Sequence, residues 1–187
     1  FYHLFGILKA VALIIIFLIA ASAALHQTMT VWEKGRTPPA GDLVTADGHK
    51  MSIYVTGRGE NTIVLLPGLG TAAPILDFMP LAQALARENR VVVVEPLGYG
   101  WSDTTKEART VENTVEELRS TLKAEGLDGP YVLMPHSISG IDALYYANTY
   151  PDEVCAVIGI DCTLPAMPNY FGEGEPAQVP AVLGLLN

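Results

Sequence analysis

The sequence predicts an α/β fold, a mostly parallel β-sheet with flanking helices, preceded by one hydrophobic helix at the N-terminus. The main observation is an alternation between residues 62 and 160, where short apolar runs typical of buried strands are separated by segments of helical periodicity. A second observation is the pair Asp47-Gly48 between two β-rich runs, which predicts a hairpin ahead of that alternation. A third is a long apolar run at the start of the chain.

That apolar run covers residues 4–25 and is interrupted only by Lys9. About 20 apolar residues span the hydrocarbon core of a bilayer, so a transmembrane helix is the leading interpretation. A cleaved signal peptide, with Ala21-Ser22-Ala23 at its cleavage site, is the alternative. A third interpretation is a helix buried in the core. We therefore predict that residues 1–27 are an anchor or signal segment. The domain is expected outside the cytoplasm, anchored to the membrane, or secreted if the segment is cleaved.

Residues 28–41 are predicted to form an extended linker, because they include a polar stretch with two prolines. The domain that follows is expected to cover residues 42–165, and strands that alternate with helices in this order imply parallel pairing. The expected elements are a hairpin at 43–45 and 51–55, buried strands at 62–66, 91–94, 131–134 and 154–160, and helices at 75–85, 111–122 and 141–150.

The composition excludes several classes of function. A net charge of -9 and the absence of a Lys/Arg cluster argue against a nucleic-acid partner. Cys155 and Cys162 lie too far apart on one strand to form a disulfide, and they are expected to be small buried hydrophobic residues. The four histidines are scattered, so no metal site is predicted, and no cofactor is expected.

Three unusual loops follow the ends of predicted parallel strands, where ligands bind in such sheets. The first loop is residues 67–70, the second is residues 95–103 and the third is residues 135–140. Their glycines let the backbone approach a ligand closely. In the third loop Ser137 sits between a strand and a helix, where a serine is held out on a sharp turn beside free amide groups.

These loops resemble motifs of the α/β-hydrolase family, and more narrowly those of membrane-anchored bacterial serine hydrolases. The first is similar to HG-x-G, with Pro67 in place of histidine, and the second to D-x-x-G-x-G-x-S, with Glu95 in place of aspartate. The third is similar to G-H-S-x-G-G, with Pro135 and Ser139 in place of glycines. The resemblance covers about residues 42–165 and implies an incomplete hydrolase core.

The resemblance implies that Ser137 is the nucleophile that attacks an acyl carbonyl of a small-molecule substrate. The backbone amides of Leu69 and Ile138 would form the oxyanion hole. Ser139 is disfavoured as nucleophile because Ile141, two positions later, is too large for the same turn. The substrate pocket is expected to include the following residues: Gly68, Gly70, His136 and Trp101.

Other polar residues of the loops are expected to be structural. Glu95 is expected to bond loop backbone at the end of its strand. Ser102 and Asp103 are expected to cap or brace the same loop.

The catalytic histidine is missing from the predicted site. In this family the histidine follows the serine and the acid, yet no histidine follows His136, and His136 is adjacent to Ser137 and unsuited to act as its base. Asp161 is a candidate for the triad acid. We therefore predict that this chain is an N-terminal portion, that residues 166–187 begin the lid region, and that the chain is inactive as it stands.

Two other functions remain open at this stage. A non-catalytic hydrolase-like module that binds a ligand or partner is the alternative to an enzyme. A cofactor-free haloperoxidase or an aminopeptidase would use the same scaffold, whereas a dehalogenase with an aspartate nucleophile is disfavoured by Ser137.

Overall fold

The computed structural model describes residues 2–165, and the predicted lid region, residues 166–187, lies outside them. The chain divides into two units, one ending at Pro38 and the other beginning at Pro39. Each unit is described by itself below.

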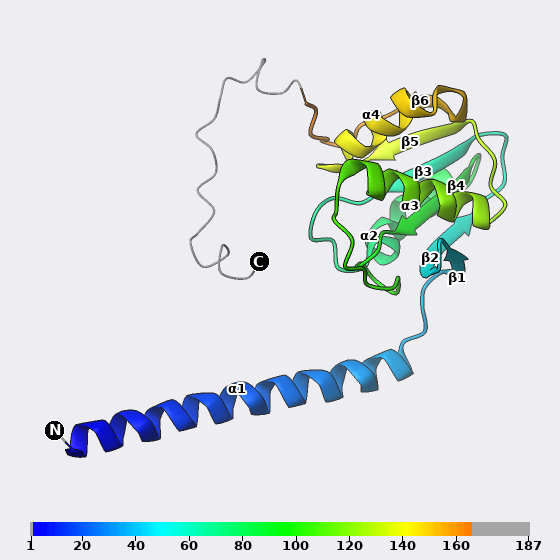
Figure 1. Ribbon diagram of the computed structural model, residues 1–187. Helices are drawn as coiled ribbons and strands as arrows, with labels where there is room; N and C mark the ends of the chain where they lie inside the picture. Colours follow the sequence, from blue (N-terminus) through cyan, green and yellow to red (C-terminus); the bar gives the residue numbers. More distant parts are fainter. Residues whose placement is uncertain (1, 166–187) are drawn as a thin grey trace. The chain divides into compact units, whose positions relative to one another are not determined.

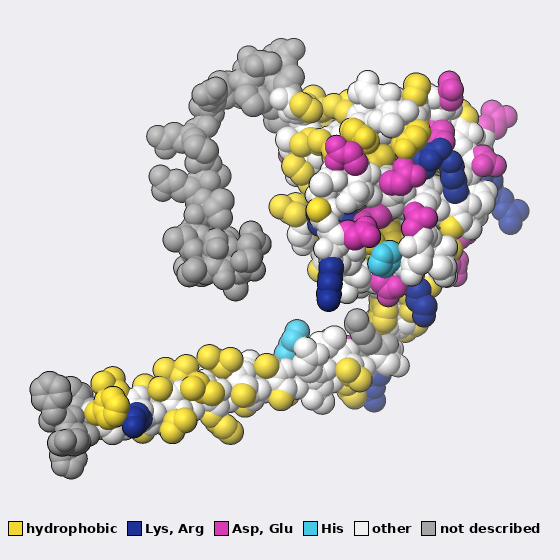
Figure 2. All heavy atoms as spheres, viewed as in Figure 1, with side chains coloured by type: hydrophobic (Ala, Val, Ile, Leu, Met, Phe, Trp, Pro, Cys, Tyr) yellow, Lys and Arg dark blue, Asp and Glu magenta, His cyan; other side chains and the backbone are white. Residues whose placement is uncertain are grey.

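The first unit is the helix α1, Tyr2–Arg36. Its segment Phe5–Glu33 has a mean hydropathy of 2.6, and none of it is buried against other described residues, so this helix is long and apolar enough to cross a membrane. Figure 2 shows hydrophobic side chains along its visible face. The prediction of an extended linker over residues 28–41 is wrong for residues 28–36, which belong to this helix. No glycine or proline interrupts the chain between Gly6 and Gly35, so the helix continues.

The second unit contains a six-stranded sheet of order β1-β2-β4-β3-β5-β6, which confirms the mostly parallel sheet (Figure 1). Only β1 with β2 and β2 with β4 pair antiparallel, while the other neighbours are parallel. The turn Asp47-Gly48 joins the first two strands as the hairpin signal predicts. The strands are β1 (Asp42–Ala46), β2 (His49–Thr56), β3 (Thr62–Leu66), β4 (Arg90–Glu95), β5 (Tyr131–Pro135) and β6 (Val154–Val157).

Helices cover both faces of this sheet, which explains why its central strands are apolar throughout. On β3, Ile63 and Leu65 pack in one core with α2, while Val64 and Leu66 pack in the other with α3 and α4. Figure 1 shows α3 and α4 side by side on one face. The helical segments are α2 (Pro74–Leu85), α3 (Val111–Ala124), α4 (Ser139–Thr149) and the short 3-10 turn η1 (Pro151–Glu153).

The edge strand β6 differs from the prediction. It ends at Val157 instead of residue 160, and most of its residues are exposed. Cys155 is exposed instead of buried, and Cys162 is only half-buried. The reason is position: β6 pairs with β5 alone, so nothing among the described residues covers its outer side. An apolar run predicts a strand but does not say which strand lies at the edge.

Glu153 joins η1 to α3 through an ion pair. Its Oε1 lies 2.9 Å from Nη2 of Arg119, and its Oε2 accepts a hydrogen bond of 2.9 Å from the Tyr146 hydroxyl. The hydrogen bond from Arg119 is the main cause that lowers the pKa of Glu153 from 4.5 to about 2, and burial opposes it.

This ion pair predicts a loss of stability in acid. Because the pKa of Glu153 is lower in the folded chain, its ionised form stabilises the fold above pH 4.5, and the contribution is lost as the pH falls towards 2. We expect Glu153→Gln to flatten the fall in the free energy of unfolding over this range, measured by urea unfolding. Glu60→Gln, at an exposed turn position, should keep the wild-type slope. An unchanged slope in Glu153→Gln would contradict this assignment.

Candidate active site

Three loops meet at one edge of the sheet because the strands before them run parallel. In the register of the sheet, Leu66 of β3 lies beside Pro135 of β5, and Leu65 lies beside Val93 of β4. The three loops that the sequence singles out therefore leave the same edge. This edge is the place where a parallel α/β sheet binds ligands.

Ser137 occupies a sharp bend between β5 and α4. Its φ of +53° is in the left-handed region, which costs a residue with a side chain roughly 1–3 kcal/mol. The bend is held by backbone bonds: the Ser137 amide donates to Ile160 O at 3.3 Å, and its carbonyl accepts from Gly140 at 3.1 Å and from Thr163 at 2.7 Å. The helix begins at Ser139, two residues earlier than expected. The surrounding fold thus maintains a strained serine at the carboxyl ends of the parallel strands.

The first loop lies directly against this bend. A Cβ placed on Gly68 would be 2.8 Å from Nδ1 of His136 and 3.2 Å from Cβ of Ser137. A side chain at these distances would force His136 or the bend to shift, so glycine at residue 68 lets the two loops lie this close together. His136 itself is half-buried, and its amide donates to Leu66 O at 2.9 Å.

The amides of Leu69 and Ile138 differ from the amides of the residues that follow them. The Gly70 amide donates to the Tyr99 hydroxyl at 3.4 Å, and the Ser139 amide donates to His136 O at 3.3 Å. Within residues 2–165, neither the Leu69 amide nor the Ile138 amide donates a hydrogen bond. Leu69 and Ile138 thus both have an unused donor, as the predicted oxyanion hole would require.

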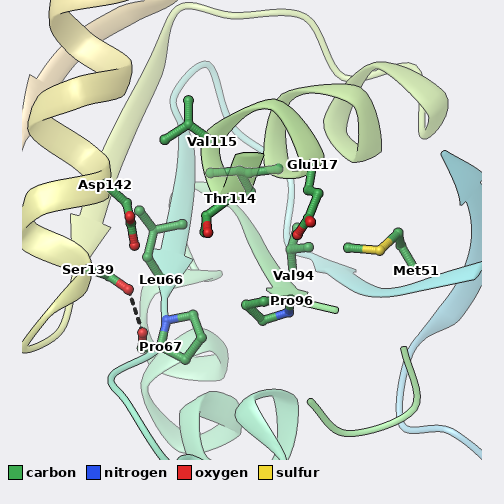
Figure 3. Close-up of a pocket in the computed structure, with 11 residues that line it drawn as sticks. Met51, Leu66, Pro67, Val94, Pro96, Thr114, Val115, Glu117, Ser139 and Asp142 are labelled. Carbon is green, nitrogen blue, oxygen red and sulfur yellow. Dashed lines mark hydrogen bonds between the residues drawn. The ribbon is translucent and has the colours of Figure 1, made fainter. Parts of the chain in front are cut away.

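Ser139 is placed differently from Ser137. It is buried, and its hydroxyl donates a hydrogen bond to the carbonyl of Pro67 (Figure 3). This bond ties the start of α4 to the first loop, which explains how a serine is accommodated where the family motif has glycine.

A cleft of about 450 Å³ opens beside the three loops. The predicted residues Gly68, Leu69 and Ile138 line it, whereas Ser137 lies next to lining residues without being one itself. Three predicted pocket residues do not line this cleft, namely Gly70, His136 and Trp101. Tyr99 takes the place expected for Trp101, whose amide is instead bonded to Glu95. The lining residues that sequence reasoning missed include Thr105, Arg109, Thr114 and Asp142.

Glu95 shapes the second loop from inside the protein. Its carboxylate is buried and accepts hydrogen bonds from the Trp101 amide at 2.7 Å and the Ile75 amide at 3.4 Å. Ser102 accepts from the Ser52 amide at 2.8 Å and donates to Glu95 O, while Asp103 accepts from the Lys50 amide at 2.8 Å. The expectation that Glu95, Ser102 and Asp103 are structural is confirmed by these bonds.

The candidate triad acid, Asp161, has no side-chain contact with Ser137 that is marked by a hydrogen bond, and the two are linked only through a backbone bond of the residue before Asp161. Asp161 follows Ile160, whose carbonyl accepts the Ser137 amide. Asp161 itself is exposed with φ +44°, and its carboxylate makes no hydrogen bond to any described residue. Among residues 2–165, no group of three or more His, Cys, Asp or Glu side chains is arranged to hold a metal ion.

The sheet order, the strained serine and the glycine loop define an α/β hydrolase. The family model described as alpha/beta hydrolase fold matches residues 61–186, and the chain belongs to this family. Its members include hydrolases of small molecules, and the chain resembles several of them.

Among its relatives, the uncharacterized protein YbdG of Bacillus subtilis is 42% identical over 125 residues, which cover 67% of this chain and 38% of YbdG. The 2-hydroxy-6-oxo-6-(2'-aminophenyl)hexa-2,4-dienoic acid hydrolase of Metapseudomonas resinovorans is 22% identical over 134 residues, 72% of this chain and 46% of the enzyme. A crystal structure of a membrane phospholipase A, a bacterial virulence factor, superposes with a TM-score of 0.60 at 22% identity, covering 82% of this chain and 51% of that one. The chain thus spans about half or less of the length of these proteins.

Proposed function

We propose that this protein is a serine hydrolase that cleaves an ester, amide or related acyl bond with Ser137 as the nucleophile. The observation that carries the proposal is the backbone of Ser137, with φ +53° between a strand and a helix and with Gly68 in contact. A serine held in this way at a sheet edge is typical of nucleophiles in this fold.

In the proposed reaction, Oγ of Ser137 attacks the acyl carbonyl carbon and forms a tetrahedral intermediate. The unused amides of Leu69 and Ile138 donate to its oxyanion, and the loss of one such donor typically costs about 10²–10³ in rate. A histidine base would accept the serine proton and pass it to the leaving group, after which water releases the acyl group. The 187 residues hold no histidine after His136, and we expect no turnover from these residues by themselves.

A fluorophosphonate probe tests the nucleophile, because it reacts with an activated serine and needs no knowledge of the substrate. When the protein is expressed from its complete gene, we expect the probe to label it covalently. Peptide mass mapping should locate the label on Ser137. A folded protein that does not label would overturn the proposal.

That outcome would support the alternative function, a non-catalytic module that binds a small ligand or a partner. The observation in its favour is that the described residues supply no histidine base for Ser137, since His136 is adjacent to it in the chain and its ring lies against Gly68. The alternative predicts that an acyl ligand binds without any covalent labelling of Ser137.

We further propose that α1 anchors the protein in a membrane, because Phe5–Glu33 has the length and hydropathy of a membrane span. The protein is then expected to stay with the membrane pellet after alkaline carbonate extraction. Replacing Ile15 and Leu18 together with arginine should release most of it, since each arginine at a span centre costs about 2.5–3.5 kcal/mol.

The matched control is Leu43→Arg, at an exposed position of β1, which should remain in the pellet. Pellet retention by the double arginine variant would contradict the anchor. The mass of the mature protein separates an anchor from a cleaved signal, because cleavage near Ala23 would remove the apolar segment.

A further inference from the structure

Asp142 is the acidic residue of the cleft lining. It lies in the first turn of α4 and lines the cleft together with Leu69 and Ile138, the proposed oxyanion donors. A smaller cavity of about 30 Å³ adjoins the cleft and shares Asp142, Ser139 and Thr114 with it. Figure 3 shows the Asp142 carboxylate on the cavity side of α4, near Ser139. A substrate held at the donors would therefore lie in the same cleft as this carboxylate.

The neighbouring cation is already paired with a different carboxylate. Arg109 also lines the cleft, but its guanidinium contacts Oε1 of Glu117. The other oxygen of Glu117, Oε2, is buried and has no hydrogen-bond partner among the described residues. No ion pair joins Asp142 to any described cation. Counted over the cleft and the adjoining cavity, which Glu117 lines, one arginine and two carboxylates leave a net charge of about -1.

The surroundings strengthen the effect of this charge. Burial raises the pKa of Asp142 above its ordinary value, although the Ser139 hydroxyl and the charge of Arg109 act in the opposite direction. The rest of the lining is largely apolar, with contributions from Pro67, Pro96 and Leu97. In such a setting a carboxylate is poorly solvated, and a cation placed beside it is attracted more strongly than in water.

We propose that Asp142 makes the cleft selective for acyl substrates that carry a cationic group and disfavours those that carry an anionic group. This inference rests on the proposed hydrolase function and adds the substrate class to it. The carboxylate takes no part in the chemistry. It acts by its charge on the group of the substrate that lies beside α4.

Three p-nitrophenyl esters of matched size test the proposal: a γ-(trimethylammonio)butyrate, its neutral isostere with a tert-butyl group, and a glutarate monoester. The protein produced from its own gene is expected to hydrolyse the cationic ester with a kcat/KM about ten-fold or more above that of the neutral isostere. The anionic ester should be the poorest of the three.

Asp142→Asn is expected to bring the ratio of cationic to neutral kcat/KM close to one, while Asp142→Glu should retain the preference. The matched control is Asp128→Asn, at an exposed position before β5 and thus at the opposite end of that strand from Ser137. It should leave all three rates unchanged. Thermal unfolding of each variant separates a loss of charge from a loss of folding.

The outcomes distinguish this inference from the proposed function. Failure of the wild-type protein to hydrolyse any of the three esters, together with no fluorophosphonate labelling, would overturn the hydrolase function itself. Hydrolysis without a preference among the esters would overturn only the role of Asp142. A preference for the cationic ester that persists in a folded Asp142→Asn variant would likewise overturn only the role of Asp142.

Discussion

Replacing Ser137 with alanine is expected to lower the rate of ester hydrolysis by about 10⁴-fold or more, and to abolish fluorophosphonate labelling. The hydroxyl supplies the attacking oxygen, so its removal eliminates the covalent step. The fold should tolerate the change, because the Ser137 side chain makes no hydrogen bond to any described residue. The residual rate would come from the oxyanion donors and from binding alone. Steady-state hydrolysis of a p-nitrophenyl ester by the protein produced from its own gene measures the effect.

The matched control is Ser139→Ala, which removes a hydroxyl two residues away. Ser139 is buried and its hydroxyl donates to Pro67 O, so we expect labelling to persist and stability to fall by about 1 kcal/mol. Labelling of a folded Ser137→Ala variant, or loss of labelling in a folded Ser139→Ala variant, would reverse the assignment of the nucleophile.

Replacing Gly100 with alanine should be among the most destabilising single changes in the second loop. Gly100 has φ +48°, and an added Cβ would overlap the buried carboxylate of Glu95. The carboxylate would have to move and release the amides of Trp101 and Ile75. We expect a loss of about 3 kcal/mol, combining the backbone strain with the broken bonds. The midpoint of thermal unfolding should therefore fall by about 6–12 °C.

Gly98→Ala is the matched control in the same loop. Gly98 also has a positive φ, +89°, but an added Cβ would meet nothing within 4 Å. Its replacement should cost only the conformational strain, about 1 kcal/mol, or roughly 2–4 °C in the unfolding midpoint. Equal effects of the two substitutions would show that Glu95 contributes little to the stability of the loop.

The elements of the fold could be predicted because their signals are local. The Asp47-Gly48 turn specifies its hairpin from adjacent residues. The helix α3 has a local start signal as well, since Thr110 at its N-cap accepts a hydrogen bond of 3.3 Å from the Asn113 amide. The end of α1 was predicted less well, because the polar residues after Leu25 do not by themselves end a helix.

Neighbours in the sheet could not be predicted in the same way. The placement of β4 between β2 and β3 depends on contacts between residues far apart in the chain. The exposure of β6 and Cys155 has the same origin, because a strand that reads as buried becomes exposed when it lies at an edge. Trp101 was named for the pocket, yet Tyr99 of the same loop lines the cleft and Trp101 does not.

By itself the sequence determined which segments become strands and helices, and it placed glycines and Ser137 where strands end. These properties follow from side-chain periodicity and turn chemistry within a few residues. Only the tertiary structure decided that Gly68 touches the bend at Ser137, that Ser139 bonds to Pro67, and that Asp142 shares a cleft with the amides beside that bend. Such contacts join residues that are distant in the chain, and they arise only when parallel strands bring their carboxyl ends to one edge.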